Sequence, residues 1–240
     1  MVEKLLVENK NIVVPGEVLA EGMNFLPGKR AFREKEKICA SILGLVNING
    51  RVISVIPLSG AYMPNKDDVV IGQIEDVGFS GWHVNIFCPY PADLNVAEAT
   101  RKYLDTNKTE LTRFLDIGEY IFAKVIKVSS SKFVILTMKD RPYRKLKEGT
   151  IIKICSTKIP RLIGKKGSMV NMLKQSSGCE ILIGQNGLVW ISGDPEKEQM
   201  VVRAISKIEE EAHREGLTDR IKTMLGGENG KKRTARETNS

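Results

Sequence analysis

Two glycines three residues apart, Gly164 and Gly167, interrupt a stretch that otherwise has helical composition. A glycine inside a helix costs on the order of 1 kcal/mol relative to alanine, so the pair indicates that one helix ends and another begins here. Apolar runs at 150–156, 179–184 and 188–193 have strand character, and 194–216 has the 3.6-residue spacing of an amphipathic helix. The predicted order after residue 149 is therefore strand, helix, helix, strand, strand, helix.

The GKKG break has the chemistry of an anion-binding loop. Glycines without Cβ atoms let phosphates approach the main chain, and the following helix presents free N–H groups and the positive end of its dipole. Five cationic residues and no acidic one lie between positions 158 and 174. We predict a nucleic-acid clamp, with bases along an apolar groove lined by Ile163, Met169 and Met172. Its residues are Lys158, Arg161, Gly164, Lys165, Lys166, Gly167 and Ser168. A plain helix–helix turn is the structural alternative for this glycine spacing.

The first two thirds of the chain have β-strand character. Residues 1–65 are rich in Val, Ile, Gly and Pro, and Asn49-Gly50 lies between two β-rich runs, which predicts a hairpin. Four further β-rich runs occupy 69–77, 81–88, 120–128 and 132–139, with a polar insertion at 91–118. Five short strands with one long interruption suit a Greek-key barrel of the OB type, although another small barrel would have the same spacing.

The overall composition favours a nucleic-acid partner. The 240 residues carry 37 Lys and Arg against 29 Asp and Glu, a net charge of +8. The four cysteines are far apart and the two histidines are isolated, so we predict no metal site and no cofactor. No apolar run approaches the roughly 18 residues that span a bilayer, and the first residues lack the apolar block of a signal peptide. We expect a cytoplasmic protein without membrane contact.

Four regions follow from these patterns. We predict a β-domain over 1–65, an OB-fold barrel over 66–147, an α+β domain over 148–215 and a flexible basic tail over 216–240. The fold class is therefore multidomain: a mostly β N-terminal half followed by an α+β domain. The tail prediction rests on the stretch GGENGKKRTARETNS, which has almost no apolar residues and should be disordered.

Residues 148–215 resemble a type I KH domain, because IGKKG falls in the correct place of the strand–helix–helix–strand–strand–helix order. The barrel segment resembles the RNA-binding domain named after ribosomal protein S-one. Gly81, Trp82, His83 and Val84 match its second strand, and Leu136, Thr137 and Lys139 match its end. His83 departs from that family, which usually has a base-stacking phenylalanine there, although imidazole can also stack.

In the barrel, the sequence leaves several roles open. Trp82 suits the barrel core and an RNA-facing role equally well, whereas Phe79 is expected to pack. Further RNA-binding candidates are His83 and the basic residues of the insertion, Arg101, Lys102, Lys108 and Arg113. Solvated loop charge is an equally good interpretation of those basic residues.

The three regions in this order are similar to the S-one/KH cap subunits of the archaeal RNA exosome, over about residues 5–215. Supporting stretches are VVPGEVLAEG, AYMPNKDDVVIGQI, IPRLIGKKGSMVNMLK and IGQNGLVWISG. The GQNG turn, Gly184, Gln185, Asn186 and Gly187, is typical of these subunits, and we interpret it as a structural hairpin that shapes the KH–barrel contact. Lys66-Asp67-Asp68 departs from the family, which often has Gly-Asp entering the barrel.

The resemblance implies a non-catalytic subunit present in three copies on a hexameric ring of RNase PH-like proteins. The N-terminal domain would dock on the ring, and the protein would capture single-stranded RNA 3′ ends and thread them through a central pore toward phosphorolytic 3′-to-5′ sites. A preference for unstructured, purine-rich tails is a further implication. The residues themselves show no catalytic constellation: Asp67 and Asp68 read as turn residues, Glu209, Glu210 and Glu211 as a solvated helix stretch, and there is no GxxxxGK[ST] loop.

Alternative functions remain. A phosphorolytic exoribonuclease with both modules would need a catalytic core far larger than the roughly 65 residues before the barrel. A stand-alone S-one/KH factor in transcription or translation would bind RNA without a ring partner. The other cap subunit of the exosome carries a zinc ribbon, which is disfavoured because this chain has no paired cysteines.

Overall fold

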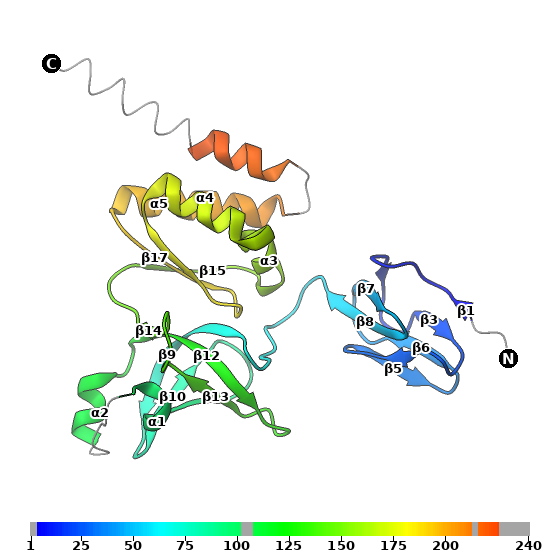
Figure 1. Ribbon diagram of the computed structural model, residues 1–240, viewed down its shortest axis with the longest axis horizontal. Helices are drawn as coiled ribbons and strands as arrows, with labels where there is room; N and C mark the ends of the chain where they lie inside the picture. The colour runs from blue at the N-terminus through cyan, green and yellow to red at the C-terminus, as the bar shows by residue number, and fades with distance from the viewer. Residues whose placement is uncertain (1–3, 102–107, 213–215, 226–240) are drawn as a thin grey trace. The chain divides into compact units, whose positions relative to one another are not determined.

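The computed structural model describes residues 4–101, 108–212 and 216–225. The chain divides into two compact units, Met1–Gly60 and the chain from Ala61 onward (Figure 1). The barrel and the α+β region belong to the second unit. The exact boundaries predicted from the sequence, after residues 65, 147 and 215, stay predictions.

The first unit contains two four-stranded sheets in its described part, with strand orders β1-β3-β6-β5 and β2-β7-β8-β4. Asn49 pairs with Val52 at the end of the β7–β8 hairpin, and Gly50 in its turn has a φ of +60°, so the predicted hairpin is confirmed. Apolar side chains from both sheets form one core, which includes Leu19, Ile38 and Ile53. The strands are β1 (Lys4–Leu5), β2 (Ile12–Val13), β3 (Val18–Glu21), β4 (Leu26–Pro27), β5 (Ala31–Glu34), β6 (Lys37–Ala40), β7 (Gly44–Asn49) and β8 (Val52–Pro57).

The second unit begins with a five-stranded barrel. The strand order β13-β11-β10-β9-β12 closes on itself because β12 also pairs with β13. Its strands are β9 (Val69–Val77), β10 (Gly81–Asn85), β11 (Ala92–Asn95), β12 (Tyr120–Val128) and β13 (Val134–Thr137), and the short β14 (Arg144–Lys145) adds to β12. The predicted polar insertion supplies the third strand, β11, and two helices, α1 (Val96–Ala99) and α2 (Lys108–Phe114). Because Leu111 and Leu115 are fully buried in the barrel core, this insertion is partly structural.

The remainder of the second unit has the predicted strand–helix–helix–strand–strand–helix order. Its antiparallel sheet, β15-β17-β16, is covered on one side by three helices (Figure 1). The elements are β15 (Thr150–Lys153), η1 (Ser156–Lys158), α3 (Ile159–Ile163), η2 (Lys165–Gly167), α4 (Ser168–Ser177), β16 (Glu180–Ile183), β17 (Leu188–Ser192) and α5 (Pro195–Glu210). The predicted fold class, a mostly β N-terminal half followed by an α+β KH-type domain, is therefore confirmed.

The prediction of a flexible tail from residue 216 is wrong for residues 217–225. Residues 217–225 are helical, and Leu217, Ile221 and Leu225 are buried in the same core as α3, α4 and α5. These three side chains are four residues apart, so they lie along one face of the helix and give it a reason to pack. Arg220 adds an ion pair with Glu211, with 3.0 Å between Nε and Oε2. Residues 226–240 lie outside the described residues.

The α+β domain is attached to the barrel through a mixed apolar and polar contact. Ile71 and Phe122 of the barrel pack in one cluster with Leu188 and Trp190 of β17. Arg144 of β14 lies over the Trp190 ring, 5.7 Å from its centre, and pairs with Glu180 of β16. These contacts join the two domains into a single compact unit.

Candidate nucleic-acid interface

The GKKG loop joins two helices through backbone angles that glycine adopts most easily. α3 ends at Ile163, α4 begins at Ser168, and the φ angles of Gly164, Lys166 and Gly167 are +74°, +51° and +80°. A Cβ on Gly164 would lie 2.9 Å from the backbone nitrogen of Met169, so this position excludes a side chain. A Cβ on Gly167 would meet no atom closer than 3.6 Å, so Gly167 is required for its angle alone.

The charge of the loop is open to solvent. Lys165 and Lys166 are exposed, and neither forms an ion pair with another residue in the described part of the chain. The first turn of α4 carries no acidic residue, and its N-cap, Gly167, has no side chain to occupy the free N–H groups. Backbone donors, the helix dipole and two ammonium groups therefore converge on one region, as anion binding requires.

The other predicted loop residues divide into two groups. Arg161 of α3 and Ser168 at the start of α4 are exposed beside the glycines. Lys158 is directed elsewhere, because its Nζ donates a hydrogen bond of 2.9 Å to the backbone oxygen of Glu209 at the end of α5. We assign Lys158 a role in tying the α3 entry to α5.

An open groove of about 440 Å³ runs beside the loop. Its lining includes Ile163, as predicted, but neither of the two predicted methionines. Met169 is 3% exposed and belongs to the domain core, because α4 turns its Met169 face toward the sheet, and Met172 is partly buried against the same core. The groove is lined by Ser156, Ile159, Pro160, Ile163, Gly164 and Gln185.

The GQNG turn lies between β16 and β17 and contacts the barrel. The Asn186 side chain is 4% exposed, accepts a hydrogen bond from the Ile71 N–H at 3.3 Å, and donates to the carbonyls of Ile71 and Ile86 at 2.7 and 3.0 Å. Gln185 bonds to Val69 through its backbone and its side chain. Gly184 and Gly187 flank these two residues and close the turn through a hydrogen bond of 3.1 Å.

On the barrel, the structure gives the positions of Trp82, whose role the sequence left open, and of Phe79, which was expected to pack. Trp82 is 1% exposed and its indole N–H donates to the Leu115 carbonyl at 2.9 Å, so Trp82 is a core residue. Phe79, which the sequence predicted to pack, is 88% exposed. Phe79 lies in the tight turn between β9 and β10, where Gly78 N–H bonds the Gly81 carbonyl at 2.8 Å and no neighbouring strand covers it.

The exposed Phe79 lies at a small pocket shared with His83. His83 Nδ1 is 2.6 Å from Oδ1 of Asp93 on the neighbouring strand β11, which fixes the imidazole ring. An exposed aromatic ring next to an oriented imidazole is a stacking surface for unpaired bases. The spacing from Gly78 to Gly81 was the signal that could have placed Phe79 at a turn tip.

Two of the four basic residues of the insertion have described side chains, Arg101 and Arg113. Arg101 pairs with Asp140, with 2.6 Å between Nη2 and Oδ1, and Arg113 is exposed in the last turn of α2. Lys108 begins α2, but its side chain lies outside the described residues, as does Lys102 altogether.

The adjacent carboxylates at the barrel entry have structural partners. Asp67 pairs with Lys124, and Asp68 accepts hydrogen bonds from the Tyr62 hydroxyl at 2.7 Å and the Asn65 N–H at 2.9 Å. Burial, together with the hydrogen bond to Asp68, raises the pKa of Tyr62 above its ordinary range.

No group of three or more His, Cys, Asp or Glu suited to a metal occurs within residues 4–101, 108–212 and 216–225. Across those same residues, we find no helix with the length and apolar character to traverse a lipid bilayer.

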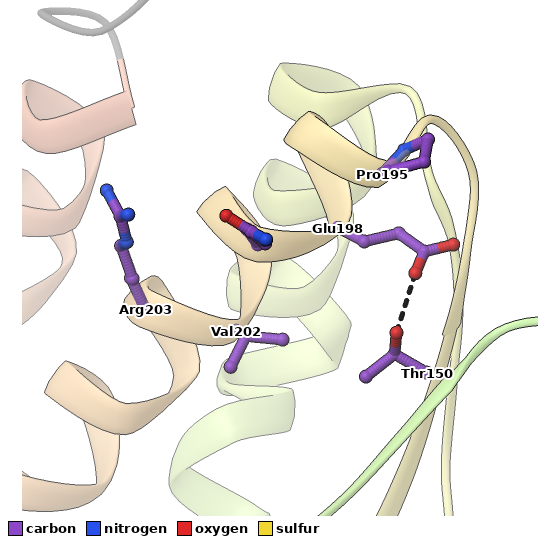
Figure 2. Close-up of a pocket in the computed structure, with 6 residues that line it drawn as sticks. Thr150, Pro195, Glu198, Val202 and Arg203 are labelled. Atoms are coloured by element: carbon purple, nitrogen blue, oxygen red, sulfur yellow. Dashed lines mark hydrogen bonds between the residues drawn. The ribbon is translucent and has the colours of Figure 1, made fainter.

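A second cavity of the KH-type domain lies on α5, next to β15 (Figure 2). Glu198 reaches from α5 to Thr150, whose hydroxyl donates to Oε2 at 2.7 Å, and Arg203 extends away from this pair. Oε1 of Glu198 also accepts the Gly193 N–H at 2.8 Å. Both carboxylate oxygens of Glu198 therefore accept hydrogen bonds that stabilise the start of α5.

Comparison with known protein families gives matches to the first unit and to the KH-type domain. The KH domain family matches residues 149–197, and the family described as "Exosome RNA binding protein RRP4 N-terminal domain" matches residues 10–59. A crystal structure assigned to the exosome complex RNA-binding proteins superimposes with a TM-score of 0.64 at 32% identity, covering 72% of this chain and 99% of that one. Fold and loop thus define a KH-domain protein with an OB-type barrel.

Whole-chain relatives identify the family. "Exosome complex component Rrp4" of Pyrococcus furiosus is 46% identical over 225 residues, which is 92% of this chain and 85% of the relative. The proteins of the same name from Methanothermus fervidus and Thermofilum pendens are 46% and 40% identical and are covered over 97% and 94% of their lengths. This chain belongs to the archaeal Rrp4 family of exosome components.

Proposed function

We propose that this chain is a non-catalytic cap subunit that captures single-stranded RNA 3′ ends and guides them through a central pore. The RNA would reach a phosphorolytic ring of RNase PH-like subunits. The observation that carries the proposal is the exposed Lys165-Lys166 pair between Gly164 and Gly167 at the start of α4. The family membership supports an exosome subunit over a stand-alone RNA-binding factor.

The loop supports recognition of the RNA backbone. Phosphates would contact the main chain at Gly164 and Gly167 and the N–H groups at the start of α4, and Lys165 and Lys166 would neutralise their charge. Such contacts provide affinity with little base discrimination. A subunit that must accept many transcripts needs this property.

The barrel supports a second contact with the same strand. Phe79 can stack on an unpaired base, and His83, held by Asp93, can extend the stacking surface. Because the KH-type domain and the barrel form one compact unit, an RNA bound at both would be held by two surfaces with a fixed relationship.

Exposed apolar residues support a protein partner for the first unit. Fourteen large apolar side chains are exposed in the described chain, and eleven of them lie within residues 4–60. Ile12, Met23 and Leu26 are each more than half exposed. Their concentration in one unit supports an interaction surface there, because large contiguous apolar patches mark such surfaces. In this proposal the first unit docks on the ring, in three copies per hexamer, and the complex acts in the cytoplasm.

The loop is tested by reversing its charge. The variant Lys165→Asp plus Lys166→Asp should bind single-stranded RNA far more weakly than the wild-type protein. Lys197→Asp plus Lys222→Asp makes the same charge change at exposed sites of the same domain, on α5 and the 217–225 helix. The control should bind within a few-fold of wild type. Equal loss in both variants would show that total charge, and not the GKKG loop, holds the RNA.

Salt dependence gives an independent measure of the same contacts. For single strands, the slope of log K against log salt is about −0.7 per phosphate contact. Replacing Lys165 and Lys166 with alanine should make the slope shallower by about 1.4 if each contacts one phosphate. A slope unchanged from wild type contradicts phosphate contact by these lysines.

Two assays test the assembly and the absence of catalysis. The purified chain alone should leave a labelled single-stranded RNA intact, with or without phosphate. On size exclusion it should co-elute with a ring of RNase PH-like proteins, whereas a stand-alone factor should elute separately. Turnover by the purified chain would favour an enzyme.

A further inference from the structure

Gln185 is held against the barrel by both of its hydrogen-bonding ends. Its backbone N–H donates to the Val69 carbonyl at 2.7 Å, and its side-chain Oε1 accepts the Val69 N–H at 3.0 Å. Val69 is the first residue of β9. Gln185 thus satisfies both backbone groups of Val69, as a paired strand would at the start of β9. Its side chain is exposed, but the bond to Val69 holds it in place.

These bonds determine which way the side-chain amide points. A backbone N–H can be satisfied only by the amide oxygen, so the NH₂ group must form the other arm of the planar amide. Among the described residues, none accepts a hydrogen bond from this NH₂ group. Gln185 also lines the groove beside the GKKG loop, together with Pro160 and Ile163.

We infer that Gln185 is a base-reading residue of the KH groove, offering a fixed donor to one nucleotide of single-stranded RNA. The inference rests on the proposed function, because it requires that RNA lie in this groove. KH grooves hold about four nucleotides, with the backbone at the glycine loop and the bases along the groove. Gly164 and Gln185 line the same cavity, so a nucleotide clamped at the loop places its neighbours within reach of Gln185.

The chemistry of the donor selects the base. Because Val69 occupies the amide oxygen, Gln185 offers hydrogen atoms and not the donor–acceptor pair of a free glutamine. If the donor is opposite the centre of the Watson–Crick edge, the ring nitrogen of cytosine or adenine accepts its hydrogen, whereas uracil and guanine present an N–H there and have only flanking carbonyl acceptors. We expect cytosine to be favoured over uracil at one position, by roughly 3- to 10-fold, the range of a single neutral hydrogen bond.

The variant Gln185→Glu tests this assignment directly. A glutamate can still accept the Val69 N–H, so the contact with the barrel is kept, while the arm facing the groove changes from donor to acceptor. Gln199→Glu makes the same chemical change on α5, at the cavity of Figure 2 and away from the groove. The probes are uridine octamers in which one cytidine is moved through each position, titrated against the full-length chain by fluorescence anisotropy.

The expected result is one position at which cytidine binds roughly 3- to 10-fold better in wild type and Gln199→Glu. In Gln185→Glu that preference should disappear or reverse. A cytidine-to-uridine ratio that is the same in all three proteins would overturn the inference. Failure of wild type to bind any octamer, together with indifference to the Lys165 and Lys166 variants, would overturn the proposed function as well.

A modified probe tests the inference without a protein variant. 3-Deazacytidine replaces the acceptor nitrogen of cytosine by C–H and leaves the rest of the base similar in shape. Placed at the selected position, it should bind wild type as weakly as uridine does. If it binds as tightly as cytidine, the Gln185 donor does not read that nitrogen.

Discussion

The Asn186 side chain bonds both backbone groups of Ile71, donating to its carbonyl at 2.7 Å and accepting its N–H at 3.3 Å. The two residues are 115 positions apart in the chain and belong to different domains. A side chain here takes the hydrogen-bonding role of a missing strand at β9, and the apolar cluster around Ile71 and Trp190 excludes water from these bonds. The barrel and the KH-type domain therefore share a core with satisfied polar groups.

The first prediction concerns this contact. Asn186→Ala leaves the carbonyls of Ile71 and Ile86 and the Ile71 N–H without partners in a buried site. Unsatisfied buried groups cost about 1–3 kcal/mol each, so with three such groups we expect the free energy of unfolding to fall by at least about 3 kcal/mol. Urea unfolding should also lose cooperativity, with tryptophan fluorescence and far-UV circular dichroism no longer coincident. Gln175→Ala on the exposed face of α4 is the matched control and should change stability by less than about 0.5 kcal/mol.

The second prediction separates the two glycines of the loop. Gly164 has φ +74° and ψ 177°, a region that is essentially restricted to glycine, and a Cβ there would lie 2.9 Å from Met169 N. Gly167 has φ +80° and ψ 12°, the left-handed region, with open space around a Cβ. Gly167→Ala should cost about 1 kcal/mol in thermal unfolding, and Gly164→Ala about 2–3 kcal/mol together with weaker RNA binding. Equal costs would mean that the α3–α4 loop adapts to a side chain.

Local rules explain why much of the KH-type domain could be predicted from the sequence. The GKKG break and the Asn49-Gly50 hairpin depend on backbone preferences of neighbouring residues, which a sequence displays directly. The period of apolar residues identified α5 for the same reason, since Met200, Val201, Ala204, Ile205 and Ile208 are all buried. The short helix over 217–225 was missed because it depends on a core that other segments complete.

The direction of individual side chains could not be predicted, because tertiary contacts decide it. Lys158 has the same local sequence signal as Lys165, yet its ammonium is drawn to the Glu209 carbonyl, 51 positions away. Phe79 and Trp82 are three residues apart, and only the hairpin geometry of β9 and β10 places one in solvent and the other in the core. Met169 was wrongly expected in the groove because the sequence does not show whether an apolar residue next to a loop faces the groove or the domain core.

The third prediction uses this pair of aromatic residues. Phe79→Ala should leave the unfolding free energy within about 0.5 kcal/mol of wild type, because an exposed ring loses little on truncation. It should weaken single-stranded RNA binding by about 1–3 kcal/mol if the ring stacks on one base. Trp82→Ala should instead lower stability by about 3–5 kcal/mol. A stability loss in Phe79→Ala with unchanged RNA binding would reverse the roles assigned to the two rings.

The last prediction concerns acid stability of the barrel. Burial raises the pKa of Glu98, but hydrogen bonds with Lys139, at 2.9 Å, and Thr137, together with the charge of Lys139, lower it by more in sum, so the net pKa lies below its ordinary value of 4.5. A carboxylate with a lowered folded-state pKa stabilises the protein above the unfolded-state pKa, and this contribution is lost as pH falls through the folded-state pKa.

Glu98→Gln should therefore reduce the melting temperature at pH 7, and the difference from wild type should shrink as pH falls below 4.5. Glu110→Gln, at an exposed position of α2, serves as the matched variant and should follow wild type at every pH. Melting temperatures measured in steps from pH 7 to pH 3 check this. No difference at pH 7, or a difference that grows as pH falls, would contradict a stabilising role for the Glu98–Lys139 pair.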